Sequence, residues 1–80
     1  MSSQYTTIER GWAERVKTLR QDLNDEDYGR FYFLLSLCQI DAYDSNDYDR
    51  REILKGIIAS LKERDYEKII DGLDELESVV

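Results

Sequence analysis

The sequence predicts an all-α fold, a compact bundle of three to four short helices. Apolar residues recur at steps of three and four along most of the 80 residues, which is the spacing of a helix face. Short alternating runs suited to strands are absent, and polar residues separate the apolar series from one another. A chain of this length forms one core, so residues 1–80 are expected to be a single helical domain.

The first helix is expected over residues 7–23. Thr6 followed three residues later by Glu9 has the form of a capping box, which places the helix start near Thr7. Five apolar side chains then share one narrow stripe: Ile8, Trp12, Val16, Leu19 and Leu23.

The second helix is expected over residues 25–43, with Asn24 as its cap and three acids in its first turn. It is apolar on two sides. One face consists of Tyr28, Phe31, Leu35, Cys38 and Ala42. The other consists of Phe33, Leu37 and Ile40. Such a helix is central in a bundle or shared with another molecule.

Two further helices are expected over residues 47–63 and 65–78. The apolar series of the third is Ile53, Leu54, Ile57, Ile58 and Leu61. That of the fourth is Tyr66, Ile69, Ile70, Leu73 and Leu76. Short polar turns between such helices predict an antiparallel bundle or a compact orthogonal array.

The pattern Asp-Tyr-x-basic occurs three times, at residues 27–30, 47–50 and 65–68. Each copy lies at an expected helix start. The favoured interpretation is helix capping by Asp, with Tyr closing the rim of the core. A repeat architecture is the alternative, although stacked helical repeats are usually longer, at ~34 residues per unit.

Composition argues against an enzyme. The chain has no histidine, which removes the usual activating base and the commonest metal ligand. Cys38 falls on an apolar face, where a packed, inert thiol is typical. A calcium loop starting at Asp44 fails because Lys55 stands where the bidentate Glu is needed. We therefore expect no catalytic residue, no cofactor and no metal site.

The charge is concentrated in one part of the chain. The formal net charge is −7, and residues 21–49 alone carry one basic and eight acidic side chains. This balance argues against nucleic acid or an anionic membrane as a direct partner. A single cysteine and the absence of a targeting or membrane segment lead us to expect a cytoplasmic protein.

Acids interleaved with tyrosines suit the surface of a basic protein, and tyrosine contributes large contact area with little entropy loss. The candidate partner-binding residues are Asp41, Tyr43, Asp44, Asp47, Tyr48, Asp49, Asp25, Glu26 and Asp27. The same acids also have a purely structural interpretation, because acids at helix starts complement the helix dipole. That interpretation is less natural for Asp41 and Asp44, which lie near a helix C-terminus.

The main functional hypothesis is a small acidic interaction module that regulates or inhibits a basic partner. In its sharpest form the carboxylates imitate phosphates, and the partner is a nucleic-acid-binding protein. In size and acidity the chain is similar to the small anti-defence proteins of phages, including anti-CRISPR and anti-restriction inhibitors, a similarity of physical character that transfers no residue role. The alternative is a homo-oligomeric structural or adaptor protein, with a homodimer formed through Phe33, Leu37 and Ile40. A carboxylate-dependent enzyme or cation-binding protein is a third hypothesis.

Overall fold

The computed structural model describes residues 11–79 and confirms the all-α prediction. Four helices follow one another in this part of the chain, and it contains no strand. They are α2 (Trp12–Asn24), α3 (Tyr28–Asp44), α4 (Tyr48–Glu63) and α5 (Tyr66–Ser78).

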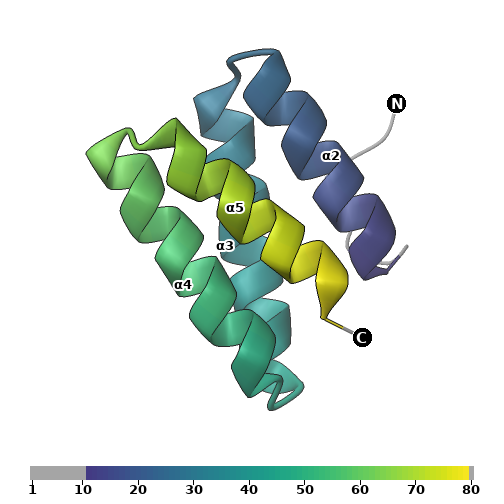
Figure 1. The fold of residues 1–80 in the computed structure, drawn as a ribbon. Helices are drawn as coiled ribbons and strands as arrows, with labels where there is room; N and C mark the ends of the chain where they lie inside the picture. The colour runs from purple at the N-terminus through teal and green to yellow at the C-terminus, as the bar shows by residue number, and fades with distance from the viewer. Residues whose placement is uncertain (1–10, 80) are drawn as a thin grey trace.

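The helices form a closed ring in which consecutive helices run in opposite directions (Figure 1). Helix α2 packs against α3 and α5, and α4 packs against the same two helices. Short connections enforce this arrangement, since a chain that turns within three residues must return alongside the helix it has left. No helix among the described residues has the length and apolar character needed to cross a membrane.

The three turns between these helices have the same geometry. In each, a residue other than glycine adopts a left-handed backbone conformation, with φ of 56° or 57°. These residues are Glu26, Asn46 and Arg64. Each is followed by an aspartate that caps the next helix: Asp27, Asp47 and Asp65.

Each of these aspartates hydrogen-bonds to two helices. The backbone N–H of Asp47 donates to the carbonyl of Ala42 at 2.8 Å, which closes α3. The Asp47 side chain accepts from the backbone N–H of Arg50 at 3.3 Å, which caps α4. Asp27 and Asp65 make the equivalent pairs of bonds. The capping interpretation of the Asp-Tyr-x-basic pattern is therefore confirmed.

The core is almost entirely aliphatic. Its members have at most 1% of their surface exposed: Val16, Leu19, Phe31, Leu34, Leu35, Cys38, Ala42, Leu54, Ile57, Ile69, Leu73 and Leu76. Most of them belong to the predicted apolar series. Five of the predicted apolar residues are instead exposed at the surface: Tyr28, Phe33, Ile40, Tyr66 and Ile70. Leu34 was not predicted, because it lies beside the apolar series of its helix rather than in it.

The helix boundaries differ from the predicted ones at two starts. Residues 7–10 lie outside the described part, and with them the capping box and Ile8. The described helix begins at Trp12, because Gly11 has φ of 93° and cannot continue a helix. The second predicted start was wrong. Asn24 ends α2 instead of capping α3, since the turn takes up the next three residues.

Helices α4 and α5 approach each other closely at Gly72. A Cβ atom at this position would lie 2.5 Å from Cγ1 of Ile57, a fully packed side chain. At Gly56, on the exposed side of α4, an added Cβ would meet no atom within 4 Å. Gly72 is therefore required by packing, whereas Gly56 is not.

We expect Gly72→Ala to lower the free energy of unfolding by about 1–3 kcal/mol, because Ile57 must move out of a filled core. The matched variant Gly56→Ala should raise it by up to ~1 kcal/mol through better helix propensity. Urea unfolding followed by far-UV circular dichroism measures both. If both substitutions changed the free energy of unfolding in the same direction, the close approach of α4 and α5 at Gly72 would be contradicted.

Candidate interaction surfaces

At one end of the bundle, two arginines contact Trp12 and each of them forms a salt bridge. The Arg15 guanidinium is 6% exposed, donates to Asp41 at 2.7 Å and lies 4.4 Å from the Trp12 ring centre. The Arg50 guanidinium lies 4.8 Å from the same ring and donates to Asp47 at 2.6 Å. It also donates to the Val79 carbonyl at 2.7 Å, directly after α5. These contacts connect all four helices.

Two of the predicted partner-binding acids therefore have internal partners. Asp41 lies near the end of α3, where the helix dipole disfavours a negative charge, and Arg15 compensates it. Removing Asp41 would take a counterion from the almost fully buried Arg15 guanidinium, which is destabilising. Asp47 is both the cap of α4 and the counterion of Arg50. Both carboxylates therefore have a structural role within the chain, and their presence does not by itself require a partner.

The environment of Asp47 changes its acidity. Burial on its own raises the pKa of this carboxyl, but hydrogen bonds from the Arg50 side chain and backbone, together with the Arg50 charge, lower it by more. The net result is a pKa below the ordinary value. The ionised form of Asp47 is consequently favoured by folding, and its contribution to stability depends on pH.

We expect Asp47→Asn to lower the free energy of unfolding at pH 7 by about 1 kcal/mol, because Asn retains the cap but loses the ion pair. Since the folded-state pKa is depressed, the contribution of Asp47 is present above the unfolded-state pKa and is lost as the pH falls through the folded-state value. Between about pH 5 and pH 2, the free energy of unfolding measured with denaturant should therefore fall more for the wild type than for the variant. Asp49→Asn, at an exposed position, is the control. Parallel pH profiles for wild type and Asp47→Asn would exclude this role.

Four more residues of the predicted site are exposed where α3 ends and α4 begins. They are Tyr43, Asp44, Tyr48 and Asp49. Three apolar side chains there have most of their surface exposed: Ile40 at 60%, Tyr43 at 62% and Tyr48 at 68%. Asp44 and Asp49 lie beside them, are exposed, and form no salt bridge within residues 11–79. We refer to these five residues as the acidic-aromatic face.

Arg51 orders the two tyrosines of this face. Its guanidinium carbon lies 4.2 Å from the Tyr43 ring centre and 4.9 Å from that of Tyr48. A hollow of about 350 Å³ adjoins Tyr43 between α3 and α4. Its lining consists of Gln39, Ile40, Tyr43, Arg51, Glu52 and Lys55. The face therefore combines apolar area with negative charge, and the cations Arg51 and Lys55 lie next to it.

The other predicted acids lie at the opposite end of α3. Asp27 caps this helix, and Asp25 accepts a hydrogen bond from Nε2 of Gln21 at 3.0 Å. Glu26 is exposed in the left-handed position of the turn. Seventeen helical residues separate the two groups by roughly 25 Å. The predicted site residues therefore occupy two places on the molecule instead of one.

Comparison of the chain with protein-family models, with curated proteins and with solved structures gave no match.

Two features of the described residues bear on the chemistry that was considered from the sequence, the grouping of possible metal ligands and the state of Cys38. Within 11–79, no group of three or more His, Cys, Asp or Glu side chains is placed to hold a metal ion. Burial raises the pKa of the Cys38 thiol to about 12, and nearby Asp41 adds to this although the Arg15 charge opposes it. The thiolate is the reactive form of cysteine, so Cys38 acts as a packed apolar side chain.

The second apolar stripe of α3 is partly exposed. Phe33 is 45% exposed, Leu37 is half-buried, and Ile40 belongs also to the acidic-aromatic face. The stripe therefore does not lie between helices within the described monomer, and it extends the exposed apolar area along α3.

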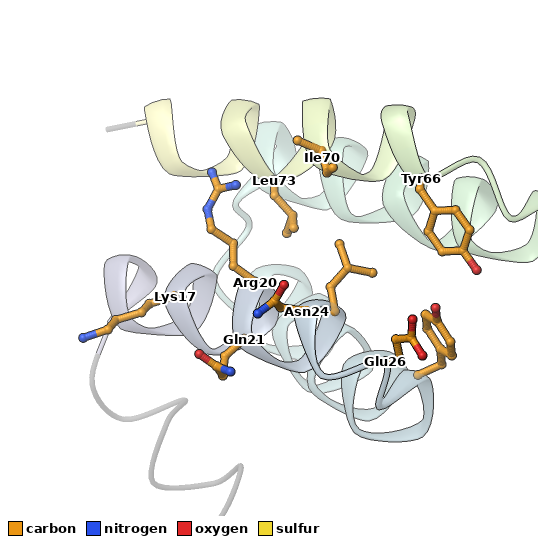
Figure 2. A pocket seen from close by; sticks show the side chains of 10 residues that line it. Lys17, Arg20, Gln21, Asn24, Glu26, Tyr66, Ile70 and Leu73 are labelled. Carbon is orange, nitrogen blue, oxygen red and sulfur yellow. The ribbon is translucent and has the colours of Figure 1, made fainter.

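A larger hollow, of about 740 Å³, lies between α2 and α5. Its aliphatic lining is Leu23, Ile70 and Leu73, and Tyr28 and Tyr66 line it as well. Figure 2 shows Arg20 and Leu73 at one end of this α2–α5 groove and Tyr66 at the other. The sequence did not predict this groove, because Tyr28, Tyr66 and Ile70 fit the apolar series and only the structure shows that they are exposed.

Proposed function

We propose that the chain is a small acidic protein-interaction module that binds a basic protein surface through the acidic-aromatic face. The observation that carries this proposal is that Ile40, Tyr43 and Tyr48, the most exposed large apolar side chains among the described residues, belong to one surface. Ile40 and Tyr43 line the same hollow, and both tyrosines contact Arg51.

Tyrosines and acids have complementary roles in such a contact. A tyrosine buries a large apolar ring while its hydroxyl remains able to hydrogen-bond, so it is a frequent anchor at interfaces. Asp44 and Asp49 supply attraction to a basic surface and accelerate association. The excess of negative charge over the whole chain acts in the same direction at longer range.

In its most specific form, the proposal is that the partner is a nucleic-acid-binding enzyme, such as a host defence enzyme inhibited by a phage-type protein. Its groove would then be occupied by carboxylates in place of phosphates. The support for this form is charge: eight acids within residues 21–49 and a net charge of −7. It predicts competition with nucleic acid, which a general interaction module does not.

The test is quantitative affinity capture from the native host with crosslinking. The site variant combines Tyr43→Ala, Asp44→Asn and Asp49→Asn, and should reduce capture of a basic partner by at least about tenfold. The charge-matched control combines Asp71→Asn and Glu75→Gln, two exposed acids of α5, a helix that contributes no residue to the acidic-aromatic face. It should retain capture. Equal capture by both variants, or capture insensitive to salt, would refute the acidic-aromatic face as the binding surface.

An oligonucleotide added to the captured complex separates the two forms of the proposal. Release of the partner supports nucleic-acid mimicry. Retention of the partner rejects mimicry and leaves a general interaction module.

A homo-oligomeric adaptor is the second candidate function. It is favoured by the exposure of Ile40 in line with Phe33 and Leu37, since soluble monomers rarely expose large apolar patches. Such a protein would use the α3 stripe to bind a second copy of itself.

Sedimentation at micromolar concentration tests this candidate. A homodimer has twice the 9.5 kDa mass of the chain. The Ile40→Glu variant should be a monomer, because dimer formation would bury an unpaired charge in the interface. Ile70→Glu, on α5, is the matched control and should leave the dimer intact. A wild-type monomer would eliminate the oligomeric candidate without affecting the main proposal.

A further inference from the structure

We infer that the α2–α5 groove is a binding site for a small, uncharged molecule with a flat apolar body. This inference does not depend on the proposed function, because the groove shares no residue with the acidic-aromatic face. It follows from the size, the closure and the charge of the groove.

The groove has the size and lining of a small-molecule site. Its volume of about 740 Å³ is within the range of such sites, roughly 300–1,000 Å³. Leu23 is half-buried, Leu73 is fully buried, and Ile70 keeps 46% of its surface exposed. A flat apolar molecule would cover Ile70 and remove this area from water, which favours binding.

The two ends of the groove are closed by side chains. At one end, Arg20 extends from α2 toward α5 and donates to Asp74 at 2.6 Å (Figure 2). At the other end, the rings of Tyr28 and Tyr66 lie 6.1 Å apart. A partner helix or strand lying along the groove would have to displace both contacts. A compact molecule fits between them.

Both ends of the groove carry charged side chains. Arg20 has Asp74 as its counterion and Glu77 at 3.5 Å, and its pKa is raised, first through the hydrogen bond to Asp74. At the other end, Glu26 lies near the tyrosines (Figure 2), and the pKa of Tyr28 is raised, first by its interaction with Tyr66.

Lys17 is the lining cation that forms no salt bridge within residues 11–79. Figure 2 shows its side chain directed away from α5, toward solvent. The charged groups of the lining thus lie at the ends and the rim of the groove, around an apolar interior. This interior favours an uncharged occupant, because a charged one would lose its hydration on entering it.

Polar groups at the rim give the occupant an orientation. Figure 2 shows the Asn24 side chain between α2 and α5, and Tyr66 with its hydroxyl at the end of the groove. An amide and a phenol can each donate and accept hydrogen bonds. The ligand class is therefore an aromatic or polycyclic molecule with one or two neutral hydrogen-bonding groups.

The experiment uses the neutral fluorophore N-phenyl-1-naphthylamine and the full chain. We expect saturable, one-to-one binding with a Kd on the order of 100 μM, the affinity typical of a ligand of this size. Ile70→Asp should weaken binding by about tenfold or more, because it places a charge against the apolar body. Ile40→Asp, at an isoleucine of α3 that is exposed as well, is the control and should bind as the wild type does.

Two further measurements keep the inference falsifiable. Asn24→Trp changes an exposed position and should block the groove without loss of helicity, so it tests the site even if Ile70→Asp unfolds. The anionic analogue 8-anilino-1-naphthalenesulfonate should bind several-fold more weakly than the neutral probe. Non-saturable binding, equal weakening by Ile40→Asp, wild-type affinity in Asn24→Trp, or tighter binding of the anion would each overturn the inference.

Discussion

The antiparallel arrangement of the four described helices depends on three turns in which a single aspartate closes one helix and caps the next. The preceding residue pays about 1–2 kcal/mol for its left-handed conformation, since none of the three is glycine. The backbone and side-chain hydrogen bonds of the aspartate offset this cost. Because each turn is so short, neighbouring helices have no alternative to packing side by side.

The same turns explain part of the charge distribution. Asp27 and Asp47 stand at capping positions, where aspartate is favoured. The charge of Asp41 is compensated by Arg15 across the interface of α2 and α3. The concentration of acids in residues 21–49 is therefore partly a consequence of the fold. The acids that remain exposed for a partner are fewer, and Asp44 and Asp49 stand out because apolar side chains adjoin them.

Periodicity was sufficient to predict the fold class and most of the core. Residues such as Leu19, Leu35 and Leu73 lie at helical spacing, and burial of one face dictates their position. The start of α3 was not predictable in the same way, because a left-handed Glu26 leaves no compositional signal of the kind that glycine gives. The spacing of residues within one helix also does not predict which residues from distant parts of the sequence contact each other.

The partner of Asp41 illustrates this limit. From the sequence alone, the unfavourable position of Asp41 near a helix C-terminus favoured a partner-binding role for it. It did not identify Arg15, which is 26 positions away in the sequence and on another helix. The α2–α5 groove was unpredictable for a related reason, since a groove depends on how closely two helices pack and not on the pattern within either one.

The tyrosines connect the construction of the fold with its candidate binding surfaces. Every tyrosine among the described residues is exposed, and the core needs only one aromatic side chain, Phe31. Tyr28, Tyr48 and Tyr66 each occupy the first position of a helix, directly after a capping aspartate. The turn thereby fixes where each ring emerges: Tyr48 on the acidic-aromatic face, and the other two at the end of the groove. A local unit selected for helix capping thus also determines where the protein presents aromatic surface to other molecules.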